Sequence, residues 1–118
     1  MNSYPMIDKV LSTLGLAKKA GKISSGTNLV STFIRGDKKP ALVLLAQDAS
    51  NNTKKLITSA SRHHKVVCIS TTYSMEQFSD AIGASNYISC IAVLDRGFAE
   101  LVTNKLNESG NHLSKQEV

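Results

Sequence analysis

The run Ala41-Leu42-Val43-Leu44-Leu45-Ala46 constrains the fold more than any other part of the sequence. A run of this length is far too short to span a membrane. It also lacks the apolar–polar alternation of a strand with one face in water, so it predicts a central strand covered on both faces. The chain has 118 residues, which is enough to supply those covering layers as a single domain with its own core.

Helical patterns alternate with strand patterns on both sides of this run. Helices are expected over about residues 5–20, 26–36, 50–63, 74–83 and 95–107, and strands over 22–25, 41–46, 65–70 and 87–94. This alternation predicts an α/β protein, a three-layer α/β/α sandwich around one sheet. Residues 1–107 would form the domain, and residues 108–118 read as a polar, flexible tail.

Particular side chains predict how the helices start and which face they bury. Ser3 is expected to cap the first helix, Ser74 opens a capping box for the fourth, and Asp95 suits the cap of the last. The apolar periodicity predicts that Leu56 and Leu101 face the core.

The charge of the chain is unevenly distributed. Residues 1–67 carry eleven basic and three acidic side chains, whereas residues 68–118 carry three basic and six acidic ones. A basic half on a small domain favours an anionic partner, with nucleic acid as the first candidate, although a basic surface that only aids solubility explains the charge equally well. Because residues 1–10 show no signal-peptide pattern, a cytoplasmic protein is expected.

The sequence contains no recognisable catalytic or metal-binding constellation. It lacks the Walker loop, the GxGxxG fingerprint, the Gly-x-Ser-x-Gly elbow and the His-Glu-x-x-His helix. Asp48 lies near an expected helix start, where a carboxylate caps free amides. Cys68 and Cys90 lie inside apolar, β-branched runs and are expected to be inert core thiols. We therefore expect no catalysis, no metal and no cofactor.

The segment Gly26-Thr27-Asn28 has the properties of an anion-binding helix start. An expected strand passes into a helix at Gly26, and the first amides of a helix have no partner within it. The Thr27 and Asn28 side chains add short hydrogen-bonding groups. Three lysines lie just upstream and would supply charge: Lys18, Lys19 and Lys22. Taken alone, the segment is equally well explained as an ordinary helix start.

Several blocks of the sequence together resemble the YlxQ-like bacterial RNA-binding proteins of the ribosomal L-seven-Ae and L-thirty-e family. The blocks are Leu14-Gly15-Leu16-Ala17-Lys18-Lys19-Ala20-Gly21-Lys22, Ser25-Gly26-Thr27-Asn28, Leu42-Val43-Leu44-Leu45-Ala46-Gln47-Asp48-Ala49-Ser50 and Asn52-Thr53-Lys54-Lys55. Ile82-Gly83 and Asp95-Arg96-Gly97-Phe98-Ala99 extend the likeness to about residues 6–106. Agreement of separate blocks, in order, is more specific than any one of them.

The resemblance implies a four-stranded mixed sheet and non-catalytic binding of structured RNA, such as kink-turns or other bulged stems, in a ribosomal or translation-associated setting. In such relatives the Gly-Thr-Asn helix start enters the RNA groove, and the loop before the last strand packs on flipped-out nucleotides. With the basic side chains nearby, the expected RNA-binding residues are Lys18, Lys19, Lys22, Ser25, Gly26, Thr27, Asn28, Leu29, Thr32, Arg35, Asp48, Lys54, Lys55, Ala84, Ser85, Asn86 and Tyr87.

Two of these positions depart from the family pattern. Leu29 stands where the kink-turn binders have Glu, and Thr32 where they have Lys, which are residues that help to read sheared G·A pairs. A leucine cannot accept a hydrogen bond from a guanine, and each lost base contact removes about 1–3 kcal/mol of discrimination. The attraction of lysines to phosphates remains. We therefore expect RNA binding with weaker discrimination for kink-turns.

Two other classes of function fit part of the pattern. A small nucleotide-binding enzyme could use the Gly26 helix start for a phosphate, and it would bind and turn over ATP or GTP. An interaction module for an acidic protein would use the basic half of the chain without RNA. Neither the identity of the RNA nor the oligomeric state follows from the sequence.

Overall fold

The structure is a computed structural model that describes residues 8–108 and 114–116. The helices are α1 (Lys9–Lys19), α2 (Thr27–Arg35), α3 (Asn51–His64), α4 (Met75–Ile82) and α5 (Arg96–Glu108). The strands are β1 (Ile23–Ser25), β2 (Leu42–Leu45), β3 (Cys68–Ser70), β4 (Cys90–Val93) and β5 (Ser114–Gln116). All five expected helices and all four expected strands are present.

The strands form one mixed sheet in the order β1-β4-β2-β3-β5. β2 and β3 are parallel, β4 is antiparallel to both β1 and β2, and β5 is antiparallel to β3. The expected four-stranded sheet is thus confirmed, and β5 adds a short fifth strand at its edge. The polar sequence Ser-Lys-Gln of β5 gave no strand signal, and it lies in the stretch expected to be a tail.

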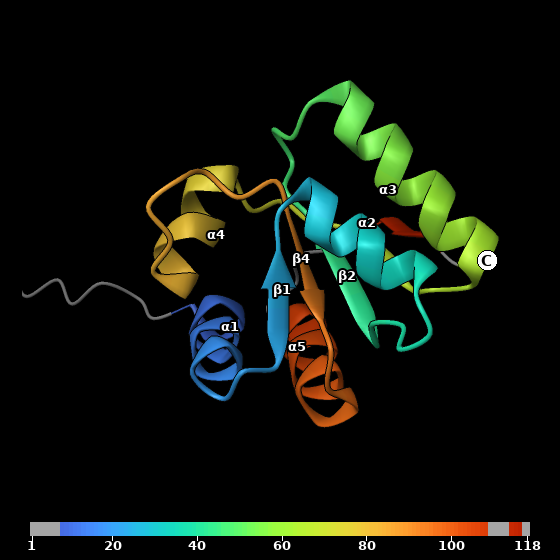
Figure 1. Cartoon of the computed structure of the whole chain (residues 1–118). Coiled ribbons are helices and arrows are strands. Elements are labelled where there is room, and N and C mark those ends of the chain that lie inside the picture. The colour runs from blue at the N-terminus through green and yellow to red at the C-terminus, as the bar shows by residue number, and fades with distance from the viewer. Residues whose placement is uncertain (1–7, 109–113, 117–118) are drawn as a thin grey trace, which may run out of the picture.

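Helices cover both faces of the sheet, which confirms the three-layer architecture (Figure 1). The α1, α4 and α5 helices lie on one face, where Leu42 and Leu44 of β2 point into the core. The α2 and α3 helices lie on the other, where Val43 and Leu45 point. All four residues of β2 are at most 1 % exposed, as expected for a strand with no face in water.

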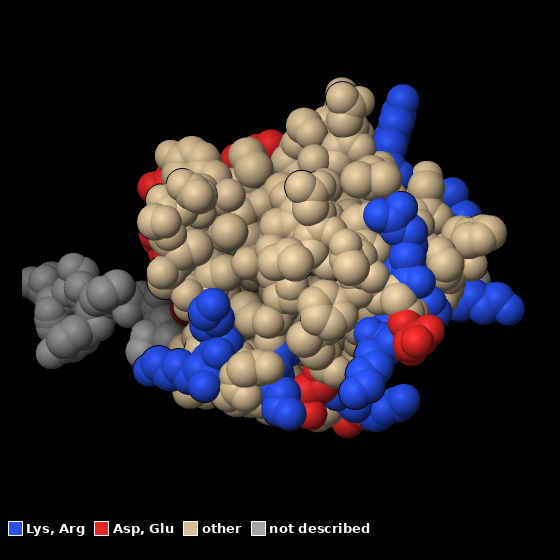
Figure 2. Space-filling view, in the orientation of Figure 1, with Lys and Arg blue, Asp and Glu red and all other residues tan. Residues whose placement is uncertain are grey.

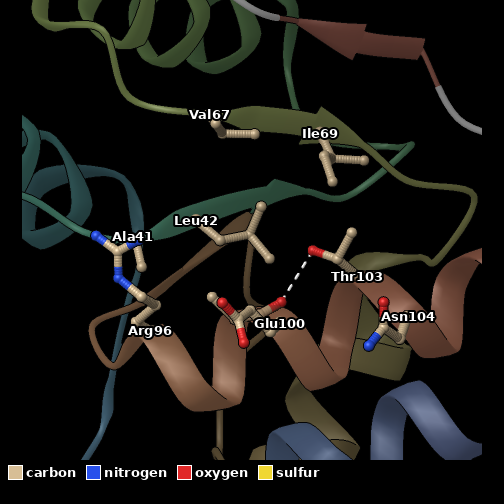
Figure 3. A pocket seen from close by; sticks show the side chains of 9 residues that line it. Ala41, Leu42, Val67, Ile69, Arg96, Glu100, Thr103 and Asn104 are labelled. Atoms are coloured by element: carbon tan, nitrogen blue, oxygen red, sulfur yellow. Dashed lines mark hydrogen bonds between the residues drawn. The ribbon is translucent and has the colours of Figure 1, made fainter.

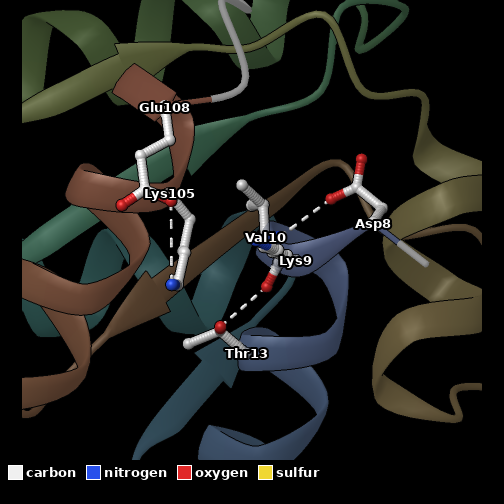
Figure 4. Close-up of polar contacts among 6 residues, drawn as sticks. All are labelled: Asp8, Lys9, Val10, Thr13, Lys105 and Glu108. Carbon is white, nitrogen blue, oxygen red and sulfur yellow. Dashed lines mark hydrogen bonds and ion pairs between the residues drawn. The ribbon is translucent and has the colours of Figure 1, made fainter. Parts of the chain in front are cut away.

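The caps of three helices were expected, and two of these expectations are confirmed. The Ser74 hydroxyl completes a capping box at α4, and the Asp95 carboxylate accepts the Phe98 amide at 2.9 Å. The expected start of the first helix is wrong. That helix begins at Lys9, where the Asp8 carboxylate accepts the Val10 amide at 2.9 Å (Figure 4), and Ser3 lies outside the described residues.

Two leucines expected in the core are largely in solvent. Leu56 of α3 is 43 % exposed and Leu101 of α5 is 47 % exposed. Both precede a fully buried residue, Ile57 and Val102, so they lie at the margin of the apolar stripe of their helix. No helix in the described residues is long and apolar enough to cross a membrane.

Cys68 and Cys90 are buried free thiols on β3 and β4, as expected. Burial raises the pKa of each thiol to about 11. Because the thiolate is the nucleophile and the metal ligand, a thiol that stays protonated at neutral pH is inert.

Candidate nucleic-acid interface

Three loops that are far apart in the sequence meet at one end of the strands, at the top of Figure 1. β1 and β2 run in the same direction and β4 runs against them, so the ends of β1 and β2 lie beside the start of β4. The Gly26 amide donates to the Cys90 carbonyl at 3.0 Å, and the Ala46 amide donates to the Ser89 carbonyl at 2.9 Å. We call residues 26–32, 47–55 and 84–89 the strand-end surface.

Three hydroxyl groups hold the strand-end surface together. The Thr27 hydroxyl lies 2.9 Å from the Ser89 hydroxyl and 3.3 Å from the Thr53 hydroxyl. These contacts join the start of α2, the start of α3 and the residue before β4. The half-buried Thr27 is therefore a positioning residue for the surface. Sequence reasoning missed Thr53 and Ser89, since a hydroxyl at a helix or strand start is too common to signal a contact.

The start of α2 differs from the other helix starts. Of the five helices in the described part of the chain, α2 is the one whose first turn has no side-chain cap. Its cap residue, Gly26, has a φ of 93° and a ψ of 151°, which is a backbone conformation open essentially to glycine. The uncapped amides at this start carry the positive end of the helix dipole and are available to an anion.

The side chains that follow along α2 are exposed, but one of them is already engaged. Asn28 and Leu29 face solvent, with 58 % of Leu29 exposed. The Thr32 hydroxyl donates to the Asn28 carbonyl at 2.9 Å, one helical turn back. An apolar side chain and an internally bonded hydroxyl thus occupy the two positions where the family pattern has a charged pair.

The loop before β4 presents its tip to solvent beside α2. Ser85, Asn86 and Tyr87 are exposed, and Tyr87 has 67 % of its surface in water. Ala84 anchors the loop, because its amide donates to the Ser79 carbonyl at 2.9 Å and its carbonyl accepts the Ser79 hydroxyl at 3.0 Å. The structure therefore brings this loop and the α2 start together on one surface, as the resemblance implied.

The turn between β2 and α3 contributes one acidic side chain, and the start of α3 contributes two basic ones. The Asp48 carboxylate accepts the Met75 amide of α4 at 2.8 Å, so it caps a helix across the loop and not the one that follows it. The Lys54 ammonium donates to the Gln47 carbonyl at 2.6 Å. Lys55 is exposed, with no side-chain partner among the described residues.

The contact of Asp48 predicts a structural effect for its removal. Asp48→Ala leaves the Met75 amide without its side-chain partner, and the loss of a helix cap costs about 1 kcal/mol. We expect thermal or urea unfolding to show that loss, while the affinity for RNA changes by less than about threefold. Ser50→Ala, which removes the cap of α3 on the same surface, is the matched control. A large loss of RNA affinity in Asp48→Ala alone would assign the carboxylate to the RNA.

The lysines upstream of Gly26 do not lie beside it. The Lys22 carbonyl accepts the Leu94 amide at 2.8 Å, at the far end of β4, so Lys22 and Gly26 lie at opposite ends of β1. Lys18 and Lys19 end α1 at that lower edge. Ser25, the last residue of β1, is half-buried and adjoins Gly26.

Arg35 also lies away from the uncapped helix start. It occupies the other end of α2, roughly 10 Å along the helix from Asn28. The pKa of His64 is lowered by desolvation first, and then by the charges of Lys39, His63 and Arg35. Figure 2 shows basic side chains over the end of α1 and over the right-hand side of the molecule, with a largely uncharged surface between them.

A hollow lies at the opposite ends of the strands. A pocket of about 430 Å³ opens between α5 and the starts of β2 and β3, with Leu42, Ile69, Arg96 and Glu100 in its wall (Figure 3). The Thr103 hydroxyl beside it donates to the Ala99 carbonyl at 2.9 Å. The described residues contain no group of three or more His, Cys, Asp or Glu side chains placed to hold a metal ion.

Comparison with known proteins agrees with the arrangement of these loops and strands. Residues 8–103 match the family model described as "Ribosomal protein L7Ae/L30e/S12e/Gadd45 family". The chain belongs to this family. The L7Ae/L30e match spans the whole strand-end surface, from the uncapped α2 start to the loop before β4.

Curated relatives and solved structures cover most of the same region. The chain is 34 % identical over 92 residues to RNA-binding protein YlxQ of Enterococcus faecium, covering 78 % of this chain and 85 % of that protein. It is 37 % identical over 94 residues to RNA-binding protein YlxQ of Bacillus subtilis, covering 80 % and 91 %.

Two solved structures share the L7Ae/L30e fold seen here. A protein of unknown function from Bacillus halodurans superposes with a TM-score of 0.77 at 26 % identity, over 86 % of this chain and 99 % of that one. The 15.5kD RNA binding protein of Giardia lamblia superposes with a TM-score of 0.67 at 14 % identity, over 85 % and 83 %. At that identity the second likeness shows the fold alone.

Proposed function

We propose that the chain is a non-catalytic, cytoplasmic RNA-binding protein that recognises structured RNA, a kink-turn or another bulged stem, in a ribosomal or translation-associated setting. The observation that carries this proposal is the uncapped start of α2, which the Thr27, Thr53 and Ser89 hydroxyls fix beside an exposed loop. The RNA-binding names of two relatives that cover most of the chain support the class of ligand.

Polar groups at the α2 start would make the central contact. Its uncapped amides are donors for a phosphate or for an acceptor on a base edge. The exposed Asn28 side chain offers both a donor and an acceptor, so it can read a base edge. Lys55, the fifth residue of α3, would contact the phosphate backbone at the border of the surface.

Apolar groups on the same surface favour an RNA with unpaired bases. Leu29 and Tyr87 expose large apolar side chains, and the faces of paired bases are hidden within a helix. A bulge or kink presents such a face, while its flanking stem supplies the phosphates. Lys18, Lys19, Lys22 and Arg35 lie beyond this contact and would contribute long-range attraction to the anion.

The test compares variants of the strand-end surface with a remote variant of equal charge. A kink-turn RNA and a fully paired stem of the same length are titrated by fluorescence anisotropy at two salt concentrations. Asn28→Ala should weaken binding of the kink-turn RNA by about tenfold, since a base contact is worth about 1–3 kcal/mol. Lys55→Gln should weaken both RNAs and reduce the salt slope by about one.

Lys22→Gln removes one positive charge, as Lys55→Gln does, but Lys22 lies at the end of β1 away from Gly26. Lys22→Gln should therefore change the affinity for RNA by about twofold or less. Equal losses in the two lysine variants would show that net charge, and not the strand-end surface, governs binding. Saturable binding of ATP or GTP with turnover would favour the nucleotide-binding enzyme instead.

A further inference from the structure

A groove lies on the flank of the molecule, between the end of α1 and the end of α4. Its volume is about 460 Å³. Gly15 lies at its base, where the helices approach so closely that a Cβ there would lie 3.0 Å from the Ala81 carbonyl oxygen. Since α1 and α4 pack through a glycine, the groove has a floor made largely of backbone and small side chains.

The wall of this groove on α1 is both apolar and basic. Leu16 has 59 % of its surface exposed, the highest fraction among the large apolar side chains of the described helices. Lys18 and Lys19 follow it at the end of the helix and are exposed. A ligand at this surface can pack an apolar group on the exposed leucine and, at the same time, pair its anionic groups with the two lysines.

Neither lysine is neutralised within the described part of the chain. The ion pair found among residues 8–108 joins Lys105 to Glu108 at 3.8 Å, on α5 (Figure 4). Asp80 of α4 lines the same groove but makes no ion pair with Lys18 or Lys19 there. The positive charge at the end of α1 is thus available to a carboxylate from outside.

We propose that the α1–α4 groove binds an acidic protein segment that also carries an apolar side chain. Carboxylates of the segment would pair with Lys18 and Lys19, and its apolar side chain would pack on Leu16 in the groove. Asp80 repels phosphates and carboxylates alike, so RNA at the groove is the alternative occupant that the peptide and RNA titrations separate from the proposed segment.

The position of the groove allows both ligands to bind together. Lys18 and Lys19 lie at the lower edge of the sheet, whereas the uncapped α2 start lies at the upper edge, with β1 between them (Figure 1). One chain would then link an RNA to an acidic protein. This proposal does not depend on the proposed RNA function, because binding of an acidic peptide to the groove can be measured without RNA.

The experiment uses the full chain and a fluorescein-labelled peptide of repeated Glu-Glu-Leu triplets. Two control peptides, of Gln-Gln-Leu and Glu-Glu-Ser triplets, remove the charge and the apolar side chain separately. Leu16→Gln and the double variant Lys18→Gln/Lys19→Gln should each weaken binding of the Glu-Glu-Leu peptide by about tenfold at low salt. Lys9→Gln, on the first turn of the same helix, removes one positive charge outside the groove and should leave binding unchanged within about twofold.

Saturating the strand-end surface with a kink-turn RNA should leave the peptide affinity unchanged. The proposal is overturned if either control peptide binds as tightly as the Glu-Glu-Leu peptide, or if Lys9→Gln weakens binding as much as the two groove variants. It is also overturned if RNA displaces the peptide, since the groove would then be part of the RNA contact.

Discussion

The double variant Leu29→Glu/Thr32→Lys is expected to bind a kink-turn RNA about ten- to a hundredfold more tightly, relative to a fully paired stem, than the unaltered chain does. The two positions lie three residues apart on the exposed side of α2, where the family pattern has this charged pair. Each restored base contact is worth about 1–3 kcal/mol of discrimination. The pair adds no net charge, so the general attraction to phosphates stays the same.

Local structure favours the new side chains at both positions. Leu29 and Thr32 are exposed, so their replacement leaves no cavity in the core. A Glu in the first turn of a helix is often drawn back to the amide of the cap residue. Here that amide belongs to Gly26 and already donates to the Cys90 carbonyl at 3.0 Å, so the carboxylate stays free for the RNA.

The control for this gain is the reversed pair, Leu29→Lys/Thr32→Glu. It has the same composition and the same net charge, but it places the carboxylate and the ammonium in exchanged positions. It should show no gain in discrimination between the kink-turn and the paired stem. Anisotropy titrations of all three proteins on both RNAs measure the effect. An equal gain in the reversed pair would mean that polarity at α2, and not the position of each charge, sets the preference.

Sequence periodicity predicted the layers because they depend on local patterns. The apolar run of β2 required cover on both faces, and the structure buries all four of its residues. β5 has no such pattern, since a short polar edge strand is held by pairing to β3 and not by its own composition. Leu56 and Leu101 were misplaced because residues at the margin of a helical stripe follow the pattern without facing the core.

The candidate site was only partly visible in the sequence. The Gly26 helix start could be found from local residue types, but Thr27 contacts Ser89 across 62 positions and Thr53 across 26. Such contacts depend on strand order, which no local pattern encodes. Nearness in sequence was also a poor guide to which lysines lie beside Gly26. An extended strand rises about 3.3 Å per residue, so Lys22 and Gly26 lie roughly 13 Å apart along β1. Lysines next to a motif in sequence thus lie at the other edge of the sheet.

Gly26→Ala is expected to reduce both stability and RNA affinity. Gly26 has a φ of 93° and a ψ of 151°, and no atom lies within 4 Å of a Cβ built there, so the cost is backbone strain and not a clash. That strain costs about 1–3 kcal/mol. Relief of the strain would turn the first peptide units of α2, whose amides are the proposed RNA donors. We therefore expect a fall in the unfolding midpoint together with at least a tenfold loss of affinity for the kink-turn RNA.

Gly21→Ala separates strain from function. Gly21 has a φ of 71°, also with no atom within 4 Å of a built Cβ, but it follows α1 at the other end of β1. Its substitution should cost about 1–2 kcal/mol of stability because a left-handed backbone disfavours a side chain. RNA affinity should stay within about twofold, since the α2 start is undisturbed. If Gly26→Ala and Gly21→Ala lose stability and bind RNA alike, the backbone at Gly26 is a structural requirement of the fold and the uncapped amides of α2 are not the RNA donors.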